Sequence, residues 1–179
     1  MKIFHTKRFL IATLGLLPLC AEAYDFKVGS YCYNVIKAYE VEVTYETIGD
    51  YSHHAGTVEI PSTVTYRNVD YKVTRIGDWA FYNNLFIDNV IIPNSVTSIG
   101  RYAFGYIIGL SSVTIPSSVT SIGEYAFMES TGLTSVNIPS SVTSIGSYAF
   151  MNIDTMTDLT LPEGIDSIYR RIGQIAGFF

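Results

Sequence analysis

Hydrophobic positions recur along this chain with a constant step. Phe81, Phe104, Phe127 and Phe150 follow one another at equal intervals of 23, and most positions around them repeat with the same period. The most regular unit contains Leu110, Val113, Ile115-Pro116, Val119, Ile122-Gly123 and Tyr125-Ala126-Phe127. A period of roughly 20–29 residues is typical of a solenoid, because so short a unit must bury its apolar side chains against neighbouring copies. The pattern therefore predicts a repeat array whose recurring apolar residues form a continuous core.

Each unit predicts its own local structure. Val113 and Ile115 are two residues apart, which places both side chains on one face of a strand. Pro116 should end that strand, because proline cannot donate a hydrogen bond to a ladder. Ile122, Tyr125 and Ala126 have the i, i+3, i+4 spacing of one apolar helical turn, entered through a bend at Gly123. We expect each coil to comprise a strand, a bend, an extended arc and a short helical turn.

The segment before the array has a different period. Residues 24–57 alternate apolar and polar positions, as in Phe26 and Val28 or Val41 and Val43, which is strand spacing. Gly29-Ser30 suits a two-residue hairpin turn, because glycine tolerates a positive φ at the first turn position. We interpret this segment as a β-rich N-terminal cap that covers the open edge of the first coil.

The solenoid itself is expected over residues 58–164. The interval from Pro61 to Pro93 is 32 instead of 23, so the first coil is longer than the others. The additional residues fall in an alternating segment, residues 64–73, which predicts a protruding hairpin.

The repeat degenerates over residues 165–179. Ile165, Ile168, Ile172, Ile175 and Phe179 nevertheless form an amphipathic helical stripe. We favour a C-terminal capping helix here, although Gly173 and Gly177 lower its helix propensity. The competing interpretation is an array that stops early.

Residues 1–23 have the pattern of a secretory signal peptide. Basic residues at positions 2, 7 and 8 precede an apolar run from Phe9 to Leu19, and Ala21-Glu22-Ala23 resembles a cleavage site. We expect cleavage after Ala23 and an exported product, secreted or at the cell surface, with the periplasm as a further destination. The alternatives are an uncleaved anchor and a lipoprotein processed at Cys20. No integral membrane span is expected in the mature chain.

The charge and cysteine content of the mature chain exclude several functions. The whole chain has 11 Lys and Arg and 16 Asp and Glu, of which residues 1–23 hold three and one, so the remainder carries 8 − 15 = −7. An acidic chain should not bind nucleic acid. Cys32 is the only cysteine after Ala23, so no intrachain disulfide is expected.

Residues 115–127, with near copies at 92–104 and 138–150, resemble the BspA-like leucine-rich repeat family. The resemblance covers nearly all of the mature chain. It implies an α/β repeat fold, a right-handed leucine-rich-repeat solenoid, with roles in surface adhesion and in binding host or neighbouring-cell proteins. Family units often carry a Cys three residues after the Phe, whereas this chain has Asn84, Ile107, Ser130 and Ile153 there. We expect Ile107 and Ile153 to fill this core position.

The candidate protein-binding face consists of strand residues that point away from the core. Residues between or beside the paired apolar positions should form two rows, because alternate strand residues face opposite sides. One row is Glu59, Ile91, Thr114, Asn137 and Thr160; the flanking row is Thr57, Asn89, Ser112, Ser135 and Asp158. At strand spacings of ~4.8 Å, five coils give a strip about 20 Å long. The alternative is a solvated sheet face with no ligand.

The loops after each Phe vary more than the rest of the unit. Variation among copied units is where a solenoid can place specificity. The candidate loop contacts are Tyr82, Phe86, Tyr106 and Ile108.

No catalytic, cofactor-binding or metal-binding residues are expected. His53 and His54 are adjacent and have no third ligand at zinc-like spacing. The serines belong to a copied Ser-Ser-Val-Thr-Ser block and none lies in a nucleophile elbow. The sequence therefore predicts a non-catalytic, exported protein-binding or adhesion module whose partner is a host matrix or neighbouring-cell surface protein. The alternative is a carbohydrate-binding surface module that uses an exposed aromatic strip.

Overall fold

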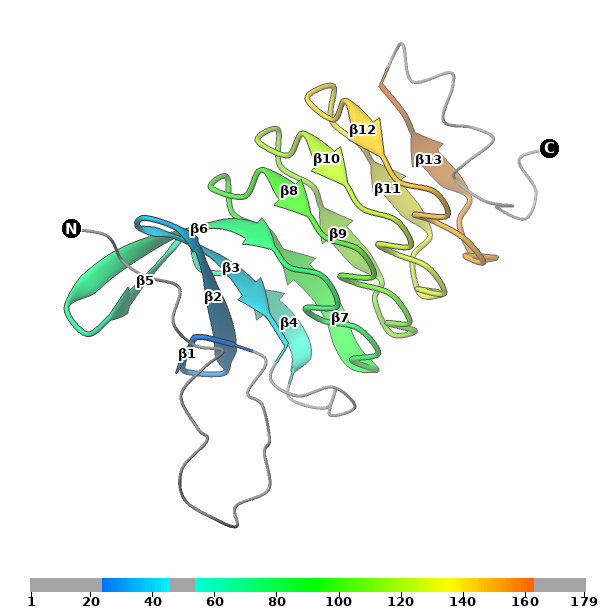
Figure 1. The fold of residues 1–179 in the computed structure, drawn as a ribbon. Coiled ribbons are helices and arrows are strands. Elements are labelled where there is room, and N and C mark those ends of the chain that lie inside the picture. Colours follow the sequence, from blue (N-terminus) through cyan, green and yellow to red (C-terminus); the bar gives the residue numbers. More distant parts are fainter. Residues whose placement is uncertain (1–23, 46–53, 163–179) are drawn as a thin grey trace, which may run out of the picture.

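The computed structural model describes residues 24–45 and 54–162, which form strands and turns without a helix (Figure 1). The N-terminal strands are β1 (Phe26–Val28), β2 (Tyr31–Lys37), β3 (Glu40–Thr44), β4 (Ala55–Glu59), β5 (Thr63–Tyr66) and β6 (Val69–Ile76). The later strands are β7 (Phe86–Ile91), β8 (Ser98–Ile99), β9 (Ser112–Thr114), β10 (Ser121–Ile122), β11 (Ser135–Asn137), β12 (Ser144–Ile145) and β13 (Asp158–Thr160). The described region is thus strand-dominated, not α/β as the sequence suggested.

The chain winds through successive coils, and each coil contributes parallel strands to two opposite sides of the molecule (Figure 1). One side holds β6, β8, β10 and β12, and the other holds β4, β7 and β9 followed by β11 and β13. Paired positions differ by one repeat unit, as in Ser121 with Ser144 and Val90 with Val113. Equivalent residues of neighbouring coils therefore lie side by side.

A stack of phenylalanine rings runs through the centre of the array. Phe81, Phe104, Phe127 and Phe150 are buried, and successive ring centroids lie 5.4, 5.3 and 5.2 Å apart with nearly parallel planes. Each ring covers the face of the next, so no coil could bury its own Phe without its neighbours. The recurring apolar residues of the sequence are core residues.

The position three residues after each stacked Phe is buried in every described coil. Ile107 and Ile153 have no exposed surface, as expected from the sequence. Ser130 is also fully buried, and its hydroxyl donates to the Phe104 carbonyl at 2.7 Å. Asn84 is buried as well, but its Oδ1 atom has no hydrogen-bond partner.

The predicted helical turn around Ile122, Tyr125 and Ala126 is not formed. The segment consists of turns in which Tyr125 has a φ of 57°, a left-handed conformation that interrupts a helix. The amides of Tyr125 and Phe127 donate to carbonyls of the next coil, Ser147 and Ala149, at 3.1 and 2.7 Å. These amides join successive coils, so they are not free for i→i−4 bonds within a helix.

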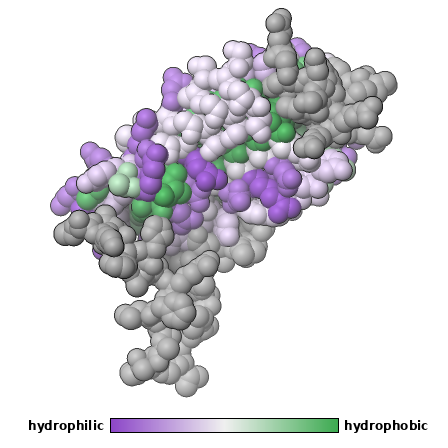
Figure 2. Space-filling model, turned by 45° about the horizontal axis from the view of Figure 1, so that its top comes forward, coloured by the Kyte–Doolittle hydropathy of each residue, from purple (hydrophilic) through white to green (hydrophobic). Residues whose placement is uncertain are grey.

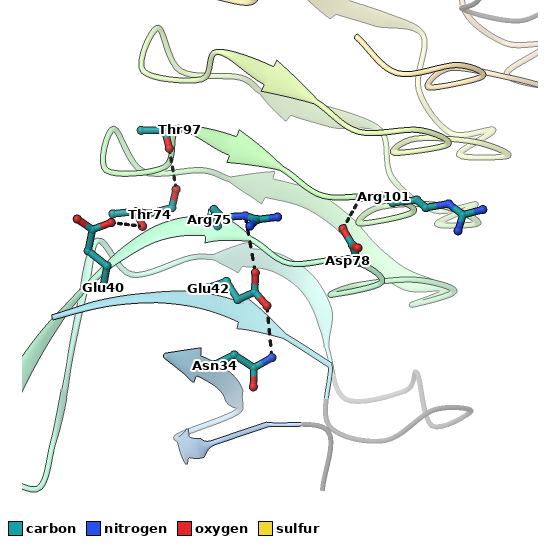
Figure 3. A network of polar contacts seen from close by, with 8 residues as sticks. All are labelled: Asn34, Glu40, Glu42, Thr74, Arg75, Asp78, Thr97 and Arg101. Atoms are coloured by element: carbon teal, nitrogen blue, oxygen red, sulfur yellow. Dashed lines mark hydrogen bonds and ion pairs between the residues drawn. The ribbon is translucent and has the colours of Figure 1, made fainter. Parts of the chain in front are cut away.

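The N-terminal strands extend the first sheet. β1 and β2 form a hairpin around Gly29, whose φ is 61°, and β2 pairs antiparallel with β3. β3 then pairs in parallel with β6. A polar network reinforces this junction: Asn34 donates to Glu42 at 3.3 Å, and Arg75 forms an ion pair with Glu42 at 3.7 Å (Figure 3).

β5 and β6 form a hairpin within the longer first coil. Its turn residues Arg67 and Asn68 both have positive φ, 51° and 61°, which is the geometry of a type I′ turn. The hairpin extends outward from the array (Figure 1), whereas Arg75 and Ile76 at the end of β6 pair with β8. Its second strand is therefore also part of the solenoid sheet.

Two expectations from the sequence lie outside the described residues: the signal peptide at residues 1–23 and the capping helix at 165–179. Within the described part of the chain, no helix has the length and apolar character needed to cross a membrane.

Candidate functional site

The ten residues of the candidate binding face occupy equivalent positions on five strands. Ile91 of β7 pairs with Glu59 of β4 and with Thr114 of β9, and Asn137 of β11 pairs with Thr160 of β13. The flanking row follows the same register, from Thr57 through Asn89 to Ser112 and from Ser135 to Asp158. All ten are exposed except Asn89, which is partly buried.

The valine side chains between the two rows point into the core. Val58, Val90, Val113 and Val136 are buried, because strand side chains alternate between the two faces. Core packing thereby determines which side chains face outward, because a shift of the strand register by one residue would expose the valines. The rows are a direct result of core packing.

The face is divided into two sheets. β4, β7 and β9 form one sheet and β11 and β13 form another, with no strand pairing between β9 and β11. β9 and β11 still lie in contact. The sequence predicted one continuous row, whereas the ladder is interrupted after Thr114.

The polar groups of this face are available to a ligand. Among the described residues, the side chains of Thr114, Asn137 and Thr160 form no hydrogen bond within the chain. In the flanking row, the Ser112 hydroxyl donates to Asn89 Oδ1 at 3.0 Å. Most of the outward polar groups are therefore free of bonds within the chain, and a partner's polar groups can replace the water that contacts them.

Hydroxyls just before the strands bond to the preceding coil on both sides of the solenoid; beside β9 and β13, Ser111 and Thr157 donate to the carbonyls of Asp88 and Thr134 at 2.9 and 3.2 Å. The hydroxyls of Thr97, Thr120 and Thr143 donate to carbonyls of the preceding coil at 3.2, 3.2 and 3.3 Å. Ser118 and Ser141 do the same at 2.6 and 2.8 Å. These hydroxyls stabilise the stacking of coils. On the side shown in Figure 2, weakly polar residues cover much of the array and hydrophobic residues reach the surface only in small areas.

The four candidate loop residues do not form one site. Tyr82 and Tyr106 contact each other, with ring centroids 5.4 Å apart, and Tyr82 also contacts Trp79 and Tyr102. Phe86 is the first residue of β7 and pairs with Ala55, so it borders the sheet face. Ile108 is exposed in the following loop. Only Phe86 and Ile108 extend the candidate face.

A second aromatic stack is formed by residues that recur in the repeat unit of the sequence. Trp79, Tyr102, Tyr125 and Tyr148 lie 4.1, 4.7 and 5.2 Å apart between ring centroids, with interplanar angles of 15° or less. All four residues have positive φ. Burial raises the pKa of the Tyr125 phenol, and the neighbouring Tyr102 adds to the rise. The recurrence of Trp or Tyr at the same position of each unit indicates such a ladder, and the structure adds the stacked geometry of the rings.

This stack leaves few ring faces open. Sugar rings bind over the face of an aromatic side chain, but Tyr102 and Tyr125 each have a ring on both sides. Arg101 also lies over the rings of Tyr102 and Tyr125, 5.1 and 5.8 Å from their centroids. The geometry gives the carbohydrate-binding alternative little support.

The residues tested for reactive chemistry have packing roles. His54 lies against Tyr31 and Phe81, with ring centroids 5.1 and 5.3 Å apart, while His53 is outside the described residues. Cys32 is buried in β2. Across residues 24–45 and 54–162, no group of three His, Cys, Asp or Glu side chains could hold a metal ion.

The fold and its repeated units define a leucine-rich-repeat protein. The family model of the BspA type leucine-rich repeat region, in six copies, matches residues 26–104 and 74–172. The matched segments span most of the chain, which therefore belongs to this family. The resemblance noted from the sequence is confirmed.

Solved structures support the same assignment. A leucine-rich repeat protein from Bacteroides capillosus ATCC 29799 is 29% identical, with a TM-score of 0.64 over 75% of this chain and 96% of that chain. One from Bacteroides ovatus ATCC 8483 is also 29% identical, with a TM-score of 0.54 over 78% of this chain and 42% of that chain. The T. pallidum leucine-rich repeat protein, 21% identical with a TM-score of 0.57 over 74% of this chain and 69% of that chain, shares the fold. A search of curated proteins found no match.

Proposed function

We propose that this protein is an exported, non-catalytic protein-binding or adhesion module. It binds through the outward rows of β4, β7, β9, β11 and β13, together with the adjoining Phe86 and Ile108. The partner is a host matrix or neighbouring-cell surface protein, and the module uses no cofactor. Family membership supports a binding role, because leucine-rich repeats are extended scaffolds whose stacked strands form continuous surfaces.

One observation carries the choice of surface. The strands of this face carry large exposed hydrophobic residues, Phe86 and Ile91, beside side chains such as Thr114 that lack intramolecular partners among the described residues, whereas β8, β10 and β12 carry no exposed large hydrophobic residue. A partner that contacts the first surface can gain hydrogen bonds without breaking any in the solenoid. Burial of the exposed hydrophobic residues by the partner would add to this gain.

Export is supported by the N-terminal pattern. Three basic residues, an apolar run and a small-residue cleavage site precede Tyr24 in the order of a secretory signal peptide. A secreted or cell-surface location would present the binding face to proteins outside the cell.

The proposal is tested by a pull-down of the mature protein against extracellular matrix proteins, with a glycan array screened in parallel. Thr114→Arg places a bulky charge at the centre of the face and should weaken binding of the captured protein about tenfold or more, since a central contact of about 2 kcal/mol has that effect. Ser144→Arg is the matched control, because Ser144 is also exposed but lies on the opposite sheet.

Both variants should keep the unfolding midpoint of the parent protein. Equal loss of binding in both, or loss only with Ser144→Arg, would place the interface elsewhere. Binding to glycans without any protein ligand would favour the carbohydrate-binding alternative.

A further inference from the structure

β7 differs from the other strands of the binding face in its exposed apolar side chains. Phe86 and Ile91 are 65% and 45% exposed, at the two ends of the strand. At the position of Ile91 the next coil carries Thr114, and at the position of Phe86 the last described coil carries Thr155. Neither the fold nor the repeat therefore requires an apolar residue at these two sites.

Two neighbouring residues enlarge the apolar surface at the Phe86 end. Leu85 is 42% exposed and its equivalent in the next coil, Ile108, is 53% exposed. The equivalent residues further along are Thr131 and Asp154, so the apolar character is confined to these two coils.

The Phe86 ring stands between small residues. On one side it pairs with Ala55. On the other side lies Gly109, where an added Cβ would be 2.9 Å from the Leu85 carbonyl oxygen and 3.0 Å from that of Ile87. Close backbone contact thus excludes a side chain at position 109. Within the described residues no other aromatic ring contacts Phe86, and most of its surface is exposed.

A carboxylate lies between the two apolar ends of β7. The pairing with β4 passes from Gly56–Ile87 to Thr57–Asn89, which leaves Asp88 as an extra residue without a partner on β4. Such a bulge redirects a side chain, and Asp88 is exposed beside the partly buried Asn89. The Asp88 carboxylate makes no ion pair or hydrogen bond with the described residues.

The surrounding face has negative charge without compensating cations. Among the residues of β4, β7, β9, β11 and β13, the charged ones are Glu59, Asp88 and Asp158. Lys37 and Arg75 lie on the other sheet, in β2 and β6. There Lys37 forms an ion pair with Glu40 and Arg75 with Glu42. A cation on a partner would meet carboxylates on this face and no repulsion from Lys or Arg in these strands.

We infer that β7 is the anchor of the binding face, and that its partner is an extended polypeptide segment in which Lys or Arg lies between two apolar side chains. The inference rests on the proposed function and specifies its ligand. The apolar side chains would cover Phe86 and Ile91, and the cation would pair with Asp88. Phe86 and Ile91 are five residues apart on a strand, or about 17 Å, so the partner segment spans a similar distance. Aromatic anchors in such positions contribute disproportionately to binding.

A phage-displayed library of random dodecapeptides tests this directly. The library is selected against the full chain, and the enriched peptides are synthesised and titrated by fluorescence anisotropy. The expected peptides carry Lys or Arg flanked by apolar residues.

The double variant Phe86→Thr, Ile91→Thr should bind these peptides about tenfold or more weakly. Thr already occupies both positions in other coils, so the unfolding midpoint should not change. Asp88→Asn should remove the preference for Lys and Arg.

The outcomes separate this inference from the function on which it rests. If Thr114→Arg weakens peptide binding and the double variant binds the peptides normally, the face binds proteins without the β7 anchor. That result would overturn the inference alone. If neither Thr114→Arg nor the double variant weakens peptide binding, both the inference and the proposed function are contradicted. Enrichment of acidic or wholly polar peptides, or of none, would also overturn the inference.

Discussion

Single residues of the phenylalanine stack determine the stability of the array. Phe127 is fully buried and contacts Phe104 and Phe150 on its two faces. Phe127→Ala should lower the free energy of unfolding by about 3–5 kcal/mol, because it removes apolar contacts and leaves a cavity between two coils. Thr114→Ala, on the exposed face, should change it by about 0.5 kcal/mol or less. Urea denaturation of the two variants measures both effects, and equal midpoints would contradict the stacking.

Asn84 is a residue whose replacement should stabilise the protein. Its Oδ1 atom is buried without a partner, and its amide lies 3.5 Å from the Tyr82 carbonyl, a long hydrogen bond. Equivalent coils carry buried Ile107 and Ile153. Asn84→Ile should raise the free energy of unfolding by about 1 kcal/mol, because an unsatisfied buried polar atom costs about 1–3 kcal/mol.

Ser130→Ala provides the contrasting control for Asn84. The Ser130 hydroxyl donates to the Phe104 carbonyl, so its removal should destabilise the protein. Thermal unfolding of both variants should show shifts in opposite directions. A lower melting temperature for Asn84→Ile would mean that its side chain has a favourable role.

At the scale of elements, the N-terminal strands should make stability sensitive to high pH. Burial raises the pKa of the Tyr33 phenol well above its usual 10.0, with Tyr31 and Cys32 adding to the rise. Above about pH 10 the unfolded chain loses this proton while the folded chain keeps it, so the stability present below pH 10 declines as pH rises.

Tyr33→Phe removes the ionisable group and should therefore move the alkaline unfolding transition to higher pH. Tyr39→Phe, at an exposed position, should not. Circular dichroism as a function of pH distinguishes the two. An unchanged transition in Tyr33→Phe would show that β2 does not limit stability in alkali.

The strands and the core were predictable from the sequence, and the connections between them were less so. Side-chain periodicity located β9 at Val113 and ended it before Pro116, because core burial dictates that pattern. The i, i+3, i+4 spacing at Ile122 predicted a helical turn instead of the observed turns. Periodicity records which side chains face inward, whereas the backbone conformation at Tyr125 depends on amides that bond to the next coil.

The candidate site was predictable in part for the same reason. The sequence placed Thr114 and Asn137 on one face, and the structure places them at equivalent positions. The interrupted ladder between β9 and β11 could not be foreseen, because the two strands have nearly identical sequences. The bulge that exposes Asp88 depends on the pairing of β7 with β4, a strand of the preceding coil, and no local pattern marks it.

For the whole molecule, the proposed export has a direct test. Culture fractionation followed by N-terminal sequencing should find an exported product that begins at Tyr24, because the small residues at positions 21 and 23 suit cleavage after Ala23. A chain that begins with an acylated Cys20 would identify a lipoprotein. A cell-associated chain that retains residues 1–23 would identify an anchor.

The uniform register between coils has a consequence for how such a protein can change in evolution. Each coil adds one ring to both aromatic stacks and one strand to each side of the solenoid, and equivalent atoms bond neighbouring coils together in the stacks and in β8, β10 and β12. In-frame duplication or deletion of one whole unit in the gene would recreate the same junctions. The protein could thus acquire a longer or shorter contact surface in a single genetic event, and subsequent substitutions at exposed positions would fit it to a partner.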